Sequence, residues 1–103
     1  MFGSSFTQAP LKTLFFTEKE MTASVTAGKE GIDNSLPSSF RSNMYYTMAR
    51  MDAIRLMVGS PIFITSGFRC PKLNYTVGGS PDSYHLSGLA VDFTVDVNKS
   101  QFS

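Results

Sequence analysis

Residues 61–95 read PIFITSGFRCPKLNYTVGGSPDSYHLSGLAVDFTV, and they contain two strand-like runs separated by turn-forming residues. The β-branched and aromatic run Ile62–Thr65 predicts a strand that ends at the Ser66-Gly67 pair. From Gly88 to Val95, apolar residues alternate with small or polar ones, which predicts a second strand. We expect the apolar face of this second strand to pack in the core and the small, polar face to line a site. The expected core face is Leu89, Val91, Phe93 and Val95, and the expected site face is Gly88, Ala90, Asp92 and Thr94.

Upstream of this stretch the pattern is helical. Apolar residues recur at spacings of three and four, which predicts one helix over about 38–58 with its stripe in the core. The stripe consists of Phe40, Met44, Met48, Met51, Ile54 and Val58. A capping-box pattern at Thr17 and Glu20 predicts a shorter helix at about 17–24. We expect an irregular segment at 1–13, a loop from Ala27 to Pro37 and a helical turn from Pro71 to Val77.

The chain has 103 residues, with 9 Lys and Arg against 8 Asp and Glu, one His and one Cys. This length predicts a single domain over 1–103, and the formal charge of +1 argues against a nucleic-acid binder with a broad basic field. One Cys excludes an internal disulfide framework and a Cys-rich zinc module. No apolar run approaches the length of a membrane span, so we expect no membrane partner. Any metal site in this chain has a single His to use.

The candidate chemistry lies at the ends of the two expected strands. His85 precedes Asp92 by seven residues, and a chain reversal at Gly88 would bring the imidazole near the carboxylate. Imidazole nitrogen and carboxylate oxygen are both ligands that suit zinc. Ser83 could bind substrate or orient the His, and Cys70 could be an adventitious third ligand or a half-buried turn residue. On spacing alone, a surface His beside a strand remains the alternative.

The order of these motifs resembles the zinc D-alanyl-D-alanine carboxypeptidase and endolysin family of peptidoglycan peptidases, and its small bacterial and phage branch in particular. The resemblance covers about residues 14–97 and is strongest in 61–95. There, Ser-Gly-Phe-Arg, Leu-Asn, Gly-Gly-Ser and Ser-x-His-x-x-Gly-x-Ala-x-Asp occur in the family's order. The fold that it implies is α+β, with N-terminal helices packed on a small antiparallel sheet that carries a zinc site, as in hedgehog-like D-Ala-D-Ala peptidases.

The resemblance also implies a role for each matching residue. His85 and Asp92 match two zinc ligands, and Arg69 matches the Arg that contacts substrate and stabilises charge on the scissile carbonyl. Ser83 matches a Ser that helps to bind the peptide. The implied cofactor is Zn²⁺, and the implied partner is the peptidoglycan stem peptide. A guanidinium suits its role because it is always charged and offers forked donors. A turn residue paired with a nearby carboxylate is the alternative for Arg69.

The sequence departs from the family at two chemical groups. The family's third zinc ligand is a second His near the C-terminal end of the domain, and a Glu just before it is the general base. This sequence has no second His, and its Glu residues, Glu18, Glu20 and Glu30, all lie far upstream. We therefore expect little or no activity from the chain as printed, so its status as an enzyme is uncertain.

Three explanations fit this departure. The chain is part of a longer gene product, a second chain completes the site, or the protein is a degenerate peptidase kept for binding. The end of the sequence just past a strand favours the first. The expected function is thus a zinc peptidase in phage or bacterial cell-wall lysis or remodelling, and the alternative is a non-catalytic peptidoglycan-binding or phage structural module. With no signal peptide in the sequence, we expect host cytoplasm followed by delivery to the wall by a helper, or a virion-associated protein.

Overall fold

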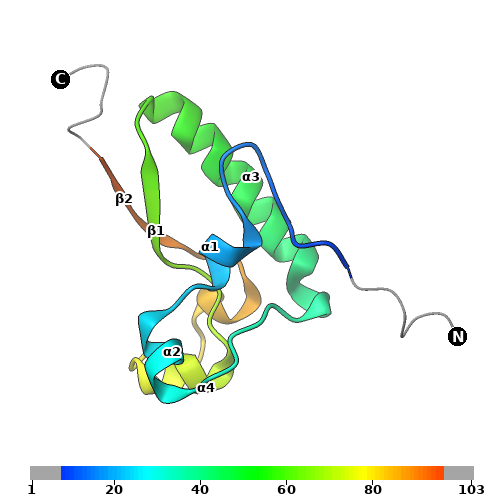
Figure 1. Ribbon diagram of the computed structural model, residues 1–103, viewed down its shortest axis with the longest axis vertical. Coiled ribbons are helices and arrows are strands. Elements are labelled where there is room, and N and C mark those ends of the chain that lie inside the picture. Colours follow the sequence, from blue (N-terminus) through cyan, green and yellow to red (C-terminus); the bar gives the residue numbers. More distant parts are fainter. Residues whose placement is uncertain (1–7, 97–103) are drawn as a thin grey trace, which may run out of the picture.

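The computed structural model describes residues 8–96, in which one long helix lies beside a two-stranded antiparallel sheet and short helices pack near one end of it (Figure 1). This architecture confirms the α+β expectation. The helices are α1 (Glu18–Thr22), α2 (Val25–Glu30), α3 (Arg41–Val58) and α4 (Pro71–Thr76), with the 3₁₀ turns η2 (Ser38–Phe40) and η3 (Tyr84–Ser87). The strands are β1 (Ile62–Ser66) and β2 (Asp92–Val95). No helix in the described residues is long and apolar enough to cross a membrane. That the chain is one domain stays a prediction, and part of the segment 1–13 lies outside the described residues.

The helix α3 forms where the stripe predicts it. Met44 and Met48 are fully buried, and Met51 is nearly so. The helix ends at Gly59, which takes the left-handed conformation at φ 69° and donates its N–H to the Arg55 carbonyl at 3.0 Å. The methionine stripe is therefore core.

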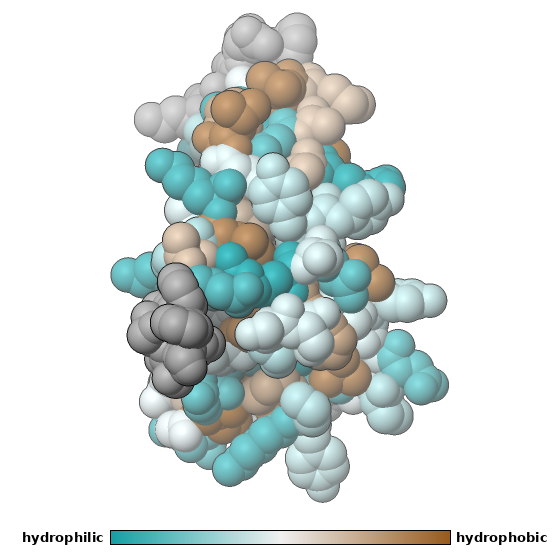
Figure 2. Space-filling model, turned by 90° about the vertical axis from the view of Figure 1, so that its right-hand side faces the viewer, coloured by the Kyte–Doolittle hydropathy of each residue, from teal (hydrophilic) through white to brown (hydrophobic). Residues whose placement is uncertain are grey.

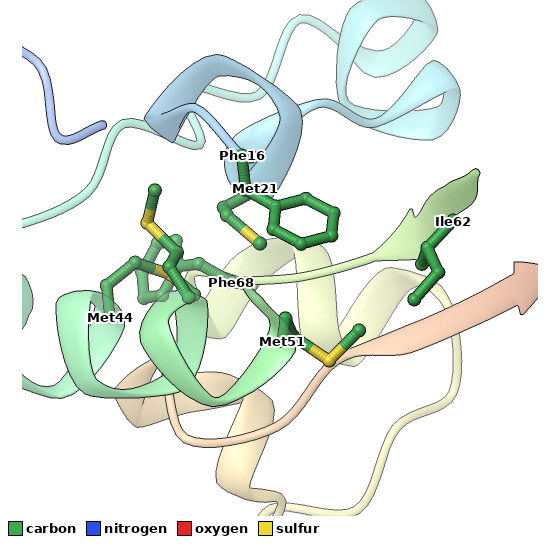
Figure 3. Packing of buried hydrophobic residues seen from close by; sticks show 7 residues of the cluster. Phe16, Met21, Met44, Met51, Ile62 and Phe68 are labelled. Atoms are coloured by element: carbon green, nitrogen blue, oxygen red, sulfur yellow. The ribbon is translucent and has the colours of Figure 1, made fainter. Parts of the chain in front are cut away.

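The core lies where α1, α3 and β1 meet. Figure 3 shows the side chains of Phe16, Met21, Met44 and Phe68 converging between these elements. Unbranched, flexible Met side chains are suited to filling the irregular space between these elements. Met21 is anchored through its backbone as well, since its carbonyl accepts from the Phe68 amide at 2.7 Å. The turn after β1 is thus fixed to α1.

One expected loop is a helix. Ala27–Pro37 was expected to be irregular, but α2 occupies Val25–Glu30. The Ser24 hydroxyl caps it by accepting from the Ala27 amide at 3.1 Å, and Gly31 ends it in the left-handed conformation at φ 67°. The capping Ser and the terminating Gly outweigh the low helix propensity of Gly28 in its interior.

The second strand is shorter than the alternation predicts. Gly88 has φ 78° and terminates η3, so residues 88–91 are not paired and β2 begins at Asp92. Leu89 and Phe93, expected in the core, are 42% and 38% exposed. They line a cavity of about 500 Å³ between α3 and the segment 84–93, together with Tyr46 and Tyr84. Val95 of β2 and Val91, just before the strand, are partly buried against the core, and the other two apolar residues lie at the surface.

On one face of the molecule the hydrophobic side chains are interspersed with polar ones. Figure 2 shows one face of the molecule, where hydrophobic residues alternate with hydrophilic and intermediate ones. Scattered apolar residues of this kind are normal for a folded domain. The pairing of β1 with β2 determines where the candidate site lies.

Candidate metal and substrate site

The two strands bring the ends of the segment 67–91 together. Their register pairs Ile64 with Phe93 and Ser66 with Asp92, with an irregularity between Ile64 and Ser66. Asp92 therefore emerges from β2 opposite the last residue of β1. Arg69 follows three residues later, and its backbone N–H donates to the His85 carbonyl at 3.0 Å. In this way Arg69, His85 and Asp92 meet at one edge of the sheet.

The His85 ring is held by the turn after β1. Its Nδ1 lies 2.7 Å from the Gly67 carbonyl oxygen, and the residue is buried. A carbonyl can only accept, so Nδ1 carries the proton, and in the neutral ring Nε2 has a free lone pair. Backbone carbonyls commonly orient metal-binding His residues in this way. Thr47 of α3 holds the other side of the site, because its hydroxyl donates at 2.7 Å to the carbonyl of Gly88, which ends the turn η3 that carries His85.

The Nε2 lone pair faces a carboxylate. Nε2 of His85 lies 3.4 Å from Oδ2 of Asp92, and the Asp92 side chain is 60% exposed. Two acceptors this close repel each other unless a proton or a cation lies between them. A neutral imidazole nitrogen and a carboxylate oxygen are both zinc ligands, so the pair fits zinc as two of its protein ligands. Within residues 8–96, no group of three or more His, Cys, Asp or Glu side chains lies together, and Cys70 does not complete the set.

Arg69 lies beside the same carboxylate. Its Nη2 is 3.7 Å from Asp92 Oδ2, and its side chain is 17% exposed. The other guanidinium nitrogens are already bonded, Nε to Ser66 Oγ at 3.2 Å and Nη1 to Asn74 Oδ1 at 3.1 Å. The guanidinium thus has a fixed orientation, with Nη2 toward the site. It also lies on the wall of a cavity of about 310 Å³ whose lining combines small side chains, such as Ala23, Ser24 and Thr65, with the larger Phe68 and Leu73.

Ser83 stands at the start of η3. Its hydroxyl oxygen accepts from the His85 backbone N–H at 3.2 Å, so it caps the turn that carries the His. The structure therefore brings His85, Asp92 and Arg69 together and places Ser83 next to them. The assigned roles in zinc and substrate binding stay predictions.

The Glu residues lie away from this site. Glu18 pairs with Arg41 at 3.2 Å, and Glu20 closes the capping box at Thr17. Glu30 is exposed at the end of α2. Each of these carboxylates is thus placed by its own helix, and none of them is positioned as a base for chemistry at His85.

Sequence reasoning did not identify three contributors to this site. Gly67 supplies the carbonyl that orients His85, and Asn74 holds Arg69. A Cβ at Gly79 would lie 2.1 Å from Asn74 Oδ1, so this glycine allows the loop to close. Asn74 and Gly79 belong to the Leu-Asn and Gly-Gly-Ser motifs of the sequence, but the residues that they contact become visible only in three dimensions.

Comparisons with known proteins identify the family of this chain. A family profile described as peptidase M15 matches residues 14–103. The chain belongs to the peptidase M15 family. This confirms the resemblance noted from the sequence motifs. The M15 chain is also 40% identical over 53 residues to the zinc D-Ala-D-Ala carboxypeptidase of Streptomyces albus G. That match covers 50% of this chain and 21% of the relative, so the chain spans about a fifth of the relative's length. No solved structure gives a significant match.

Proposed function

We propose that this M15 chain carries part of a zinc peptidase site that acts on peptidoglycan stem peptides. The observation that carries the proposal is the His85–Asp92 pair, in which Nδ1 of the ring bonds the Gly67 carbonyl and Nε2 faces the Asp92 carboxylate at 3.4 Å. Family membership supports the same reading, and so does the activity in the name of the Streptomyces relative. Zinc, when bound, polarises a carbonyl and lowers the pKa of a water molecule.

In this proposal the chain's own residues bind and orient. His85 and Asp92 hold the metal, and the Gly67 carbonyl keeps the imidazole in the tautomer that leaves Nε2 unprotonated. Arg69 stabilises negative charge on the scissile carbonyl oxygen through Nη2, which faces the site. The cavity beside Arg69, with its small side chains, accommodates an alanine-type residue of the substrate. Ser83 lies at the same edge and binds the peptide backbone.

Zinc stoichiometry is the first test. Equilibrium dialysis of the purified chain against excess zinc, followed by elemental analysis, should give about one bound zinc per chain. His85→Ala and Asp92→Asn should each lower zinc affinity by at least about tenfold, because loss of even outer-shell support costs that much. Asp82→Asn is the matched control, since it removes the same charge from an exposed residue of the neighbouring loop. No zinc uptake in excess metal would refute the proposal for this chain.

Hydrolysis is the second test. A synthetic stem peptide that ends in D-alanyl-D-alanine is incubated with the zinc-loaded chain, and the products are separated by mass spectrometry. Where the zinc-loaded chain releases product, Arg69→Ala should keep its zinc while turnover falls by about 10²–10³-fold, the usual cost of removing one oxyanion donor. Loss of zinc in the same variant would mean that Arg69 supports the scaffold and does not act on the substrate.

The bond that is cleaved and the biological setting are finer parts of the proposal. Release of terminal D-alanine alone would assign carboxypeptidase action. Cleavage of cross-links in purified cell walls, followed by a fall in turbidity, would assign an endopeptidase with a lytic role for a phage or bacterium. Lysis would then be compared between intact cells that receive the chain from outside and cells that produce it inside, which tests delivery to the wall.

A second function is favoured by one observation. The described residues bring two zinc ligands together and no third, and each Glu is engaged elsewhere or exposed. A module that keeps Arg69 and Ser83 but binds the stem peptide without cleaving it fits this arrangement. Zinc-independent binding of the peptide, with no product after long incubation, would support this second function and refute the first.

A further inference from the structure

The Arg69 guanidinium is held on two sides by hydrogen bonds. Ser66, the last residue of β1, accepts from Nε at 3.2 Å, and Asn74 of α4 accepts from Nη1 at 3.1 Å. The third nitrogen, Nη2, is directed at Asp92. Arginine has four rotatable side-chain bonds and loses rotamer entropy when it is fixed. A guanidinium held at two nitrogens therefore points in one direction before any ligand arrives.

Asn74 is itself fixed, and in one orientation. It is 3% exposed, and its Nδ2 donates to the Ser80 carbonyl at 2.8 Å. Guanidinium nitrogens only donate and carbonyl oxygens only accept, so the amide oxygen must face Arg69 and the amide nitrogen must face Ser80. Both ends of the amide require the same orientation. Asn74 thus links the guanidinium to the loop 78–81.

That loop closes tightly over the amide. The Gly79 N–H donates to the backbone carbonyl of Asn74 at 2.8 Å. A Cβ at Gly79 would meet both the side-chain oxygen Asn74 Oδ1 at 2.1 Å and Arg69 Nη1 at 2.9 Å. From Ser80 the hydrogen bonds continue to the metal pair. The backbone carbonyl of Ser80 accepts from the Ser83 N–H at 3.0 Å, and the Ser83 hydroxyl oxygen accepts from the His85 N–H. The backbone carbonyl of His85 in turn accepts from the Arg69 N–H.

We propose that Asn74 is a positioning residue that holds the Arg69 guanidinium at the metal pair. Asn74 is buried and does not touch substrate. It acts through Arg69, so this proposal rests on the proposed function of that residue. A group misplaced by about 1 Å can cost a reaction about 10²-fold. Removal of the amide should therefore lower kcat by about 10- to 100-fold and leave zinc binding and KM within about threefold of the wild type.

The test that does not need turnover is nitrogen-15 NMR of the guanidinium in the zinc-loaded chain. The Arg69 signals are assigned by their loss in Arg69→Ala. In the wild type we expect an Nε–H that is protected from exchange with water and separate signals for the two Nη groups, because rotation about the Nε–Cζ bond is blocked. Asn74→Ala should merge the Nη signals and speed their exchange with water. Wild-type signals that average as in free arginine would overturn the proposal, whatever the variants do.

Two further variants separate positioning from folding. Asn74→Asp keeps an acceptor for Nη1 and should retain the separate Nη signals and at least threefold more kcat than Asn74→Ala. Asn43→Ala removes an amide of the same size that donates to the Ser87 carbonyl at 3.1 Å, and it should keep the guanidinium signature. Equal loss of the signature in Asn43→Ala would show that general loosening is the cause and would overturn the proposal. A wild type that cleaves no stem peptide refutes the proposed function, while the NMR result still decides whether Asn74 holds Arg69.

Discussion

The substitution Gly79→Ala tests how tightly the loop 78–81 closes on the site. Its Cβ would lie 2.1 Å from Asn74 Oδ1, whereas non-bonded heavy atoms are in favourable contact at about 3.5 Å. The amide oxygen would have to move by more than about 1 Å, which breaks its bond to Arg69 and strains its bond to Ser80. A hydrogen bond to a charged group contributes about 1.5–3 kcal/mol and a neutral one about 0.5–1.5 kcal/mol. We therefore expect a loss of about 2–4 kcal/mol in the free energy of unfolding.

A matched control is available in the same chain. Gly28 lies inside α2, and an added Cβ there meets nothing within 4 Å. Gly28→Ala should raise the free energy of unfolding by about 0.5–1 kcal/mol, because alanine has the higher helix propensity. Urea unfolding followed by circular dichroism gives both values, provided that the slope of the transition is unchanged.

A double-mutant cycle identifies the cause of the loss. In an Asn74→Ala background the oxygen that the new methyl meets is gone, so Gly79→Ala should cost less than about 1 kcal/mol there. Independent substitutions would instead add to within about 0.5 kcal/mol. Equal costs in the two backgrounds, or a Gly79→Ala variant as stable as the wild type, would refute the argument that Gly79 and Asn74 interlock.

Three other substitutions test the scaffold, each by urea unfolding. Met48→Ala should destabilise the fold by about 2–5 kcal/mol because Met48 is fully buried, while Met57→Ala, at a residue 80% exposed, should change stability by less than about 0.5 kcal/mol. Asp52→Ala should cost about 2–4 kcal/mol, since its carboxylate accepts three hydrogen bonds from the segment 13–15; a cost below 1 kcal/mol would contradict this account. Gly67→Ala places a Cβ 2.2 Å from a backbone carbonyl of α1, so we expect about 3 kcal/mol of destabilisation together with weaker zinc binding.

Local signals made α1 and α3 predictable from the sequence. The capping box at Thr17 and the stop at Gly59 depend on hydrogen bonds between residues three or four apart, which the sequence displays directly. The helix α2 was missed because six residues with a central Gly28 give little periodicity, and the Ser24 cap was the remaining signal. The length predicted for β2 was wrong because Gly88 adopts a left-handed conformation, which an alternating pattern of apolar and polar residues cannot reveal.

The candidate site divides in the same way. The facing of His85 and Asp92 was predicted from a chain reversal near Gly88, and the structure places their side chains 3.4 Å apart. The residues that orient them come from other segments. Gly67, which orients His85, precedes it by 18 residues, and a carbonyl acceptor leaves no mark on residue type. Partners of this kind require the fold, since nearly any residue could supply the same backbone atom.

The segment 67–91 contains both His85 and Arg69 and supports the two side chains in different ways. Backbone bonds from two adjacent residues near its start, Phe68 to Met21 and Arg69 to His85, hold the turn after β1 against both α1 and η3. Disruption there displaces the imidazole and the guanidinium together. Asn74 is held from within the segment, by the Ser80 carbonyl, so its loss releases the guanidinium and leaves the His85 carbonyl contact in place. Variants should therefore fall into two groups, one that loses zinc binding and arginine order at once and one that loses arginine order alone. This separation follows from the hydrogen-bond connectivity of a single 25-residue connection between paired strands.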